Sequence, residues 1–475
     1  MKNLTSNRLR NVFPAILLIV ALTVSLIWTD TTSAQTRKEP LNSKPQVTST
    51  ELPQPTAIQV PPQYQILDIG IIQMGDTASQ GFGVSTGNVA VGRSIRTGGA
   101  QALSWTLGGG IVGLPILAGR THCVSNSANN TGIVVGSCGT TLFGTSRLPV
   151  IWQNGVVVQL PLPAGETLGD ANDVNSSGVA VGSVNSGSLQ KAVYFSGGTA
   201  TYISQTTPGG SFFQTAFGIN DAGRVVGPGI DPNNAARNVG MVYDIGSGFA
   251  FEVGALPGAN GALAFAVSNT GFVVGSSMLN QGSGLPFIWS QAGGMVAIPL
   301  AAGTTQGSAR AVNSAGWVVG NDSSAFSIPF LYDGTSTYRL ADLIPAGSGW
   351  DLSMNTSSSA LGISDTNVIV GTGVFNGLTH AYAMIPIANV SLSGRVLSAD
   401  GNGIRNVRVT VSGGNLLTPV TVQTRTFGAF NFQGLQSGLT YTVTVSTKKY
   451  VLMQTSRMVT PQADVTNFDF VAEPF

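Results

Sequence analysis

The 475-residue chain is longer than one ordinary domain, and its length corresponds to about three domains. Only 9% of its residues are charged, 43% are hydrophobic and 62 are glycine. This composition excludes a mainly helical protein, which needs more Leu, Glu and Lys, and a disordered one, which needs less apolar surface. It favours an all-β fold with many short strands.

The first 34 residues have the features of an export signal. Lys2, Arg8 and Arg10 are followed by a mainly apolar segment (12–28) and by small residues suited to cleavage at 32–34. An uncleaved membrane anchor is the alternative. No later stretch approaches the ~20 apolar residues of a spanning helix. We therefore predict a secreted, periplasmic or cell-surface protein that is not inserted in a membrane after signal removal.

Signal removal would leave 19 basic and 20 acidic residues. A nucleic-acid-binding protein needs a basic surplus, so we predict no nucleic-acid partner. Residues 35–63, with six prolines among Gln, Thr, Ser and Lys, are predicted to be a disordered linker.

A segment that ends in two apolar residues and a glycine recurs seven times after the linker. Clear copies read GINDAGRVVG (218–227) and AVNSAGWVVG (311–320). The closing glycines lie 44 to 51 residues apart, at Gly92, Gly136, Gly182, Gly227, Gly275, Gly320 and Gly371. This period indicates one supersecondary unit per copy.

Each copy carries the residues of a tight turn. Seven residues before the glycine stands an Asn or Ser that can bond to its own backbone: Ser85, Asn129, Asn175, Asn220, Ser268, Asn313 or Ser364. Three residues later stands a residue that tolerates positive φ: Asn88, Gly132, Gly178, Gly223, Gly271, Gly316 or Asn367. Flanked by apolar pairs, this turn predicts a β-hairpin.

An apolar strand with an aromatic residue near its end follows each hairpin except the last. The aromatic residues are Trp105, Trp152, Phe195, Tyr243, Trp289 and Tyr332, and the seventh copy has Met384 at this position. With one more strand, each repeat holds about four, as in one propeller blade. We predict that the aromatic residues form core between blades rather than a binding platform.

The ends of the repeat region favour a closed ring. Residues 64–70 resemble the fourth strand of a unit, whereas the last repeat stops after its third strand, near residue 387. The two pieces can complete one blade, so we predict a seven-bladed β-propeller over residues 64–388. A solenoid or an irregular array of sandwiches is the alternative.

Both cysteines, Cys123 and Cys138, lie in the second repeat. A turn at 129–132 would place them directly opposite each other, where Cα separations suit a disulfide. We predict this disulfide, which an oxidising compartment would favour. Two buried free thiols are the alternative.

Residues 389–475 follow a different pattern, with alternating segments such as 390–397 and 440–446 separated by turns such as Asp400-Gly401. We predict a small β-sandwich here.

The repeats resemble the HAF family of extracellular repeats, named for a His-Ala-Phe element. The element survives best as His380-Ala381-Tyr382. The resemblance covers residues 64–387 and implies a secreted or surface location and a propeller-like fold, with no defined activity.

Residues 390–475 are similar to the carboxypeptidase regulatory-like domain, a transthyretin-like sandwich. The matching residues are Gly394, Arg395, Val396, Asp400, Gly401, Val407, Val409, Thr424, Gly428, Phe430, Phe432, Leu435, Gly438 and Tyr441. The resemblance implies an accessory domain without a peptidase site, in a fold sometimes described as carbohydrate-binding-like.

No catalytic, cofactor-binding or metal-binding residue is predicted. His380 occupies the family position, which favours a structural role, and His122 next to Cys123 could act only as an isolated ligand or base. Two histidines and two paired cysteines are too few for a zinc site. Candidates for a catalytic carboxylate pair are Asp170, Asp173, Asp221, Asp231, Asp322, Asp351 and Asp365, most of them next to turns.

We therefore predict a non-catalytic binding or scaffolding protein whose partner is an extracellular protein or a glycan, without cofactors. A propeller-type carbohydrate-active hydrolase or lyase with channel carboxylates is one alternative, and a purely structural surface protein is another. Two carboxylates about 5–10 Å apart in the channel would favour the enzyme.

Overall fold

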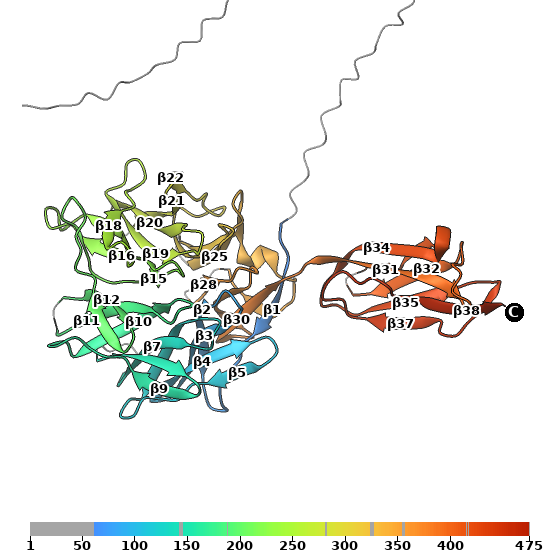
Figure 1. Cartoon of the computed structure of the whole chain (residues 1–475), viewed down its shortest axis with the longest axis horizontal. Helices are drawn as coiled ribbons and strands as arrows, with labels where there is room; N and C mark the ends of the chain where they lie inside the picture. The colour runs from blue at the N-terminus through green and yellow to red at the C-terminus, as the bar shows by residue number, and fades with distance from the viewer. Residues whose placement is uncertain are drawn as a thin grey trace, which may run out of the picture. The chain divides into compact units, whose positions relative to one another are not determined.

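The computed structural model describes residues 61–475 except 142–145, 188, 281–282, 324–326, 354–356, 415, 417 and 475. The predicted export signal (1–34) and nearly all of the predicted linker (35–63) lie outside the described residues. The described chain forms a seven-bladed propeller and a β-sandwich, which confirms the predicted fold class (Figure 1). Its two helical segments are the 3-10 turns η1 (Leu340–Leu343) and η2 (Thr426–Gly428). None of the described helices could span a membrane.

The first three blades are antiparallel meanders of four strands, counted from the centre of the ring outward. Blade 1 has β2 (Ala78–Val84), β3 (Ala90–Arg96), β4 (Gly99–Thr106) and β5 (Gly110–Gly113). Blade 2 has β6 (His122–Ala128), β7 (Val134–Gly139), β8 (Leu148–Gln153) and β9 (Val156–Gln159). Blade 3 has β10 (Leu168–Val174), β11 (Ala180–Asn185), β12 (Lys191–Ser196) and β13 (Thr199–Tyr202).

The next three blades repeat this order, except that the innermost strand of blade 4 is split in two. Blade 4 has β14 (Phe212–Phe213) and β15 (Gly218–Ile219), then β16 (Arg224–Ile230), β17 (Asn238–Asp244) and β18 (Phe249–Glu252). Blade 5 has β19 (Gly261–Val267), β20 (Val273–Asn280), β21 (Ser283–Ser290) and β22 (Gly294–Ala297). Blade 6 has β23 (Gln306–Val312), β24 (Val318–Ser323), β25 (Ser327–Tyr332) and β26 (Thr337–Arg339).

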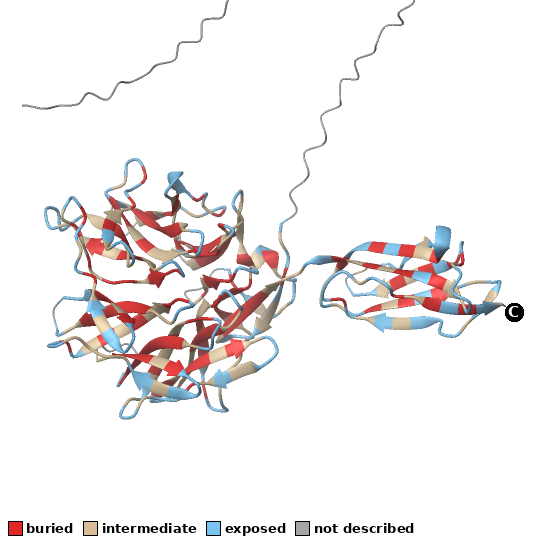
Figure 2. Ribbon diagram, viewed as in Figure 1, coloured by how far each residue is buried: buried red, intermediate tan, exposed pale blue. Residues whose placement is uncertain are grey.

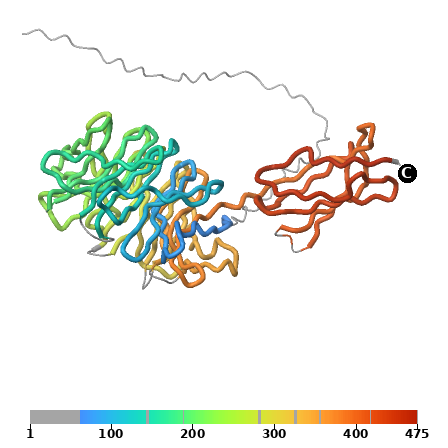
Figure 3. Tube along the Cα trace, turned by 90° about the horizontal axis from the view of Figure 1, so that it is seen from below, coloured from blue at the N-terminus to red at the C-terminus, as the bar shows by residue number. Residues whose placement is uncertain are grey.

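Blade 7 closes the ring with a strand from the start of the propeller. Its inner part is β27 (Trp350–Asp351) and β28 (Ser359–Ile363), followed by β29 (Ile369–Phe375) and β30 (Leu378–Pro386). The fourth strand is β1 (Tyr64–Asp68), which runs antiparallel to β30. The blue and orange segments therefore lie side by side in both views (Figures 1 and 3). The predicted closure by the two incomplete units is confirmed.

The hydrophobic core of the propeller is divided among the interfaces between blades. Seven clusters of buried residues each combine side chains from two neighbouring blades, and they include one between blades 7 and 1. Figure 2 shows this buried layer along the strands of the ring. An open row of seven units would have six interfaces and two uncovered end faces, so a seventh interface requires a ring.

The two apolar residues before each closing glycine contribute to two different interfaces between blades. Successive side chains of a strand point to opposite faces, so each member of the pair packs against a different neighbouring blade. In blade 4, Val225 belongs to the cluster shared with blade 3, whereas Val226 belongs to the cluster shared with blade 5. The other six pairs divide in the same way, which explains why each repeat needs two apolar residues.

The sandwich has two four-stranded sheets around one core. One sheet has the order β34 (Ala429–Gln436), β31 (Asn389–Ser398), β38 (Phe470–Pro474) and β36 (Tyr450–Leu452). The other has the order β33 (Val420–Gln423), β32 (Arg408–Gly413), β35 (Tyr441–Ser446) and β37 (Ser456–Val459). The buried faces meet through residues such as Leu392, Val409, Phe430 and Val443.

Candidate functional site

The seven predicted turns share one geometry. In every copy the side chain of the first turn residue accepts a hydrogen bond from the backbone N–H four positions later. Asn175 Oδ1 accepts from Val179 at 3.0 Å, and Ser268 Oγ from Phe272 at 3.1 Å. The residue three positions after the first has positive φ in all seven turns. The turn prediction is confirmed.

Each innermost strand contains a β-bulge three residues before its turn. In blade 2, Ser125 pairs with Gly136 and Ser127 with Val135, so Asn126 has no partner on β7. In blade 4 the corresponding Phe217 lies between β14 and β15. The seven residues at this position, called bulge residues below, are Phe82, Asn126, Asn172, Phe217, Phe265, Arg310 and Leu361.

Beside the bulge, the backbone of the innermost strand approaches the closing glycine closely, which explains why every repeat has glycine at this position. The backbone oxygen two residues before the bulge residue lies where a Cβ on the closing glycine would be. In blade 3 this is the oxygen of Asp170 against Gly182, and the other six blades show the same overlap. A side chain at the closing position would push the inner strand away.

The bulges and turns surround one central cavity of about 560 Å³, to which all seven blades contribute. Its lining includes every bulge residue. It also includes the second residue of every turn: Thr86, Asn130, Ser176, Asp221, Asn269, Ser314 and Asp365. The cavity therefore lies at the end of the propeller that carries the turns. A bulge re-aims a side chain, and here seven bulges aim side chains at the ring centre.

The bulge residues give the cavity an uneven wall. Phe217 and Phe265 from neighbouring blades lie 5.9 Å apart between ring centroids, and the Arg310 guanidinium lies over the Phe265 ring at 4.5 Å. On another part of the ring, Asn126 and Asn172 donate hydrogen bonds to backbone oxygens of the following blade at 2.9 Å. The cavity thus joins aromatic faces, amide groups and a cation.

A belt of hydrogen bonds links neighbouring turns around the cavity. Where the first turn residue is Asn, its Nδ2 donates to the backbone oxygen of the next turn, as from Asn129 to Asn175 at 2.9 Å and from Asn220 to Ser268 at 3.0 Å. Ser is too short for this bond. In the blades with Ser, other side chains reach across, such as Thr270 to the Ser314 backbone oxygen at 2.9 Å.

Asp173, one of the predicted carboxylate candidates, lies in the cavity wall. Its carboxylate accepts hydrogen bonds from Ser127 Oγ at 2.6 Å, Val174 N at 2.9 Å and Ile219 N at 2.8 Å. Burial raises its pKa to about 6 in spite of these bonds, and the negative charge of Asp221 acts in the same direction.

Two more candidate carboxylates line the cavity and are engaged by neighbouring blades. Asp221 accepts from Ser176 N at 2.8 Å and from Asn269 Nδ2 at 2.8 Å. Asp365 accepts from Ser314 N at 2.8 Å and from Ser314 Oγ at 3.1 Å. Three of the seven candidate aspartates thus lie in one cavity, where they hold blades together.

The remaining aspartates lie elsewhere. Asp170 pairs with Arg147 at 2.8 Å and Asp231 with Arg237 at 2.9 Å, whereas Asp351 accepts from Ser353 N at 2.9 Å. Asp322 lines a second cavity of about 500 Å³ between blades 5 and 6, which shares Phe265 and Arg310 with the first. In the described part of the chain no group of three or more His, Cys, Asp or Glu could hold a metal ion.

Asp322 is fully buried and is bonded on one side only. Its Oδ2 accepts from Ala301 N at 2.7 Å and from Thr304 Oγ1 at 3.1 Å, whereas its Oδ1 has no partner among the described residues. Burial raises its pKa to about 6. A half-satisfied carboxylate in this position favours the protonated form.

The two histidines have structural surroundings. His380 Nδ1 lies 2.9 Å from Asp68 Oδ1, so it joins β30 to β1 where the ring closes. His122 Nδ1 lies 2.8 Å from the Thr121 hydroxyl. Five of the six repeated aromatic residues, all except Tyr332, are buried, as expected for core between blades.

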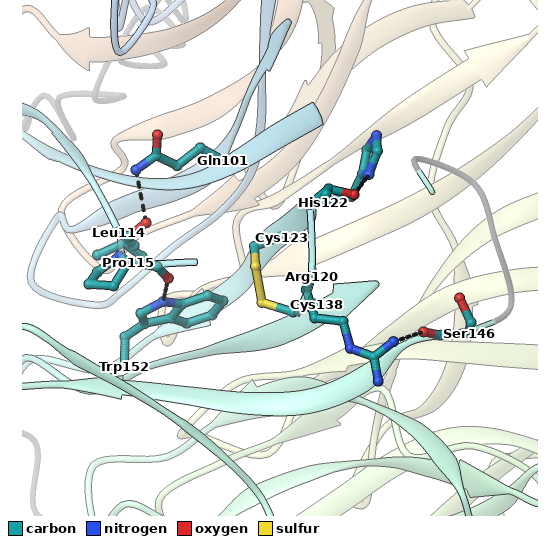
Figure 4. Close-up of a disulfide and its surroundings, with 10 residues drawn as sticks. Gln101, Leu114, Pro115, Arg120, His122, Cys123, Cys138, Ser146 and Trp152 are labelled. Atoms are coloured by element: carbon teal, nitrogen blue, oxygen red, sulfur yellow. Dashed lines mark hydrogen bonds between the residues drawn. A yellow bond between two sulfur atoms is a disulfide. The ribbon is translucent and has the colours of Figure 1, made fainter. Parts of the chain in front are cut away.

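The structure contains the predicted disulfide between Cys123 and Cys138 (Figure 4). The hairpin loop is one residue longer than predicted, because Asn129 N bonds to the Ile133 oxygen. The bulge at Asn126 compensates for this residue, so that Cys123 and Cys138 are direct partners with Cα atoms 4.1 Å apart.

The sequence interpretation identified the turns but not the bulge residues. A period-two pattern assigns every second side chain to one face, and a bulge breaks that assignment at one residue. The available signal was position: each bulge residue stands three places before the first turn residue.

Solved structures that resemble the chain include a streptogramin B lyase, with 11% identity over 68% of this chain and 98% of that chain and a TM-score of 0.41. Virginiamycin B lyase from Staphylococcus aureus has 11% identity over 68% and 99% of the two chains, with a TM-score of 0.43. YCF48 bound to D1 peptide has 11% identity over 69% and 98%, with a TM-score of 0.41.

A search of curated proteins finds no match. Residues 391–473 match the family model of the carboxypeptidase regulatory-like domain, which confirms the predicted resemblance of the C-terminal sandwich.

Proposed function

We propose that this chain is an exported, non-catalytic binding protein whose central propeller cavity takes a short oligosaccharide. The convergence of seven bulge residues on one cavity carries this proposal. In it the propeller spans residues 64–388 and the sandwich, residues 389–475, acts as an accessory module. The resemblance of the repeats to the HAF family supports the predicted surface location.

The chemistry of the cavity wall supports a sugar more than a folded protein surface. Sugar rings present C–H faces that stack on aromatic rings and hydroxyl groups that need polar partners, and the wall offers both kinds of group. Phe82, Phe217 and Phe265 supply the rings, and Asn126 and Asn172 supply amide oxygens to which no described residue donates. A volume of about 560 Å³ falls in the range of small-molecule sites.

The cavity carboxylates support binding rather than catalysis. Asp173, Asp221 and Asp365 each accept hydrogen bonds from neighbouring blades, so their oxygens already maintain the wall. A glycosidase needs one carboxyl group that protonates the leaving oxygen and one that acts as base or nucleophile. Such groups must be turned toward the substrate rather than toward the protein.

The location rests on the sequence signal and on the disulfide. Structural disulfides persist in oxidising compartments, and Cys123–Cys138 is fully buried. Appearance of the unprocessed chain in the cytoplasm would contradict this part of the proposal.

Binding can be tested with the mature full-length protein on a panel of oligosaccharides, followed by calorimetric titration of those retained. We expect saturable binding that is lost in Phe265→Ala and unchanged in Phe249→Ala, an exposed phenylalanine on the outer strand β18. Melting temperatures of both variants check that the fold survives. Absence of saturable binding, or equal binding by Phe265→Ala, would contradict the proposal.

A further inference from the structure

Arg310 has an unusual position among the cations of the propeller. It is the bulge residue of β23, and it lines both the central cavity and the second cavity between blades 5 and 6. Its guanidinium lies over the Phe265 ring at 4.5 Å, a contact that holds the planar group in place while its edge stays available.

The guanidinium of Arg310 has no acceptor among the described residues. Three other arginines of the ring are paired with carboxylates: Arg96 with Asp76 at 3.1 Å, Arg147 with Asp170 at 2.8 Å and Arg237 with Asp231 at 2.9 Å. The cavity itself contains carboxylates, but none of them bonds to Arg310. Asp173, Asp221 and Asp365 are held by N–H and O–H groups of neighbouring blades.

The surroundings of Arg310 remove part of the hydration of its charge, although the residue itself is exposed to the cavity. Its side chain is accessible to solvent inside the cavity, yet the surrounding blades displace much of its hydration and lower the pKa of the guanidinium. A partly desolvated cation is stabilised by an anion that accepts hydrogen bonds in the geometry of the guanidinium edge. Carboxylate and sulfate groups both fit that edge.

We propose that Arg310 forms an anion subsite in the central cavity, and that the ligand is an oligosaccharide with a carboxylate or sulfate group. The inference rests on the proposed function. The sugar ring next to the acidic group stacks near Phe265, and the acidic group accepts a bidentate hydrogen bond from Arg310. With this subsite the expected ligand is an acidic oligosaccharide, whereas the amide groups and aromatic rings of the wall alone could bind neutral sugars as well.

Calorimetric titration with matched sugars tests this subsite. The probes are a neutral hexose oligosaccharide, its uronic acid counterpart and its sulfated counterpart, each of equal length and linkage. We expect one or both acidic sugars to bind the mature protein at least tenfold more tightly than the neutral one. The comparison of the two acidic probes shows which group the subsite prefers.

Variants separate the charge from the fold. Arg310→Gln should weaken binding of the acidic sugar by about 10- to 100-fold, the effect of losing a charge-assisted hydrogen bond, and leave the neutral sugar within about threefold. Arg310→Lys should restore part of the affinity, because it keeps the charge without the planar fork. Arg408→Gln, an exposed arginine on β32 of the sandwich, is the matched control.

The possible failures are distinguishable. If sugars bind in a Phe265-dependent way but Arg310→Gln keeps the full preference for acidic over neutral sugars, the subsite is wrong and the proposed function stands. If no sugar binds, both are wrong. If an acidic hexapeptide binds in an Arg310-dependent way and sugars do not, the proposed ligand class is wrong.

Discussion

The hydroxyl of Thr366 donates a hydrogen bond to Asn88 Oδ1 at 2.9 Å across 278 residues of sequence. This contact joins the last turn of the propeller to the first, so it completes the belt of hydrogen bonds around the central cavity. The same closure is made at the outer edge by β1 on β30 and by the His380–Asp68 pair. The ring therefore closes through local polar contacts as well as through its hydrophobic interfaces.

The closing glycines should tolerate no side chain. We expect Gly182→Ala to lower the free energy of unfolding by about 3 kcal/mol or more, because its Cβ would overlap the Asp170 backbone oxygen. Gly108→Ala, in the open turn between β4 and β5, should change it by less than about 1 kcal/mol. Urea denaturation followed by tryptophan fluorescence measures both. An equal loss of stability in the two variants would show that the inner strand does not exclude a side chain at the closing position.

Asn175 makes hydrogen bonds within its own turn and one to the next blade, and substitutions can separate these two contributions. Its Oδ1 accepts from Ser177 N and Val179 N, and its Nδ2 donates to the Asn220 oxygen. Asn175→Ala should cost about 2 to 4 kcal/mol of stability, because all three bonds are lost. Asn175→Ser should cost about 1 kcal/mol, since Ser keeps the turn bond in three other blades. A Ser variant as unstable as the Ala variant would show that the bond between blades dominates.

Loss of the disulfide should destabilise blade 2. Cys123 and Cys138 are 15 residues apart, and closure of a loop of that size contributes about 3 kcal/mol in the chain-entropy model. We expect a Cys123→Ala/Cys138→Ala double variant to fold but to unfold at a lower denaturant concentration than the oxidised protein. Two free thiols in the exported protein, measured by alkylation and mass spectrometry, would contradict this prediction.

Asp322 should make the stability depend on pH. Its pKa of about 6 lies above the ordinary value of 3.8, so between these values the folded chain holds a proton that the unfolded chain has released. Stability from this group is therefore present at pH 4 and is lost as pH rises through about 6. Asp322→Asn should abolish this pH-dependent loss of stability, because the amide occupies the same space and carries no charge at any pH.

At pH 7.5 we expect Asp322→Asn to be more stable than the native protein by about 1 to 3 kcal/mol. The difference should shrink as pH falls from about 6 to 4, as measured by denaturant unfolding at each pH. Ser323→Ala serves as control, because Ser323 is next to Asp322 in the chain but is not one of its hydrogen-bond partners. An advantage of equal size at pH 4.5 and 7.5 would contradict the assigned protonation.

The sequence predicts what depends on contacts within one repeat. The side chain of Asn175 bonds to its own turn and Gly178 has positive φ, so both can be recognised from residue type and spacing alone. The ring closure was also predictable, because the unpaired strand at 64–70 had to find a partner. The turns need no knowledge of the neighbouring blade, and the closure needs only the number of strands in the first and last repeats.

The cavity depends on contacts that no single repeat contains. Arg310 lies over Phe265 of the preceding blade, and Asp173 accepts hydrogen bonds from Ser127 of blade 2 and Ile219 of blade 4. The sequence alone does not single out Arg310, and it offers Asp173 only as one of seven candidate aspartates. Only the bulge, and the ring that brings seven bulges together, makes them neighbours of one cavity.

A crystal structure of the mature protein with a bound acidic oligosaccharide tests the central claim most directly. We predict a sugar ring in the central cavity against Phe265, with its acidic group within hydrogen-bond distance of the Arg310 guanidinium. A ligand on the outer strands of the propeller or on the sandwich, with the central cavity unchanged, would contradict the proposed function.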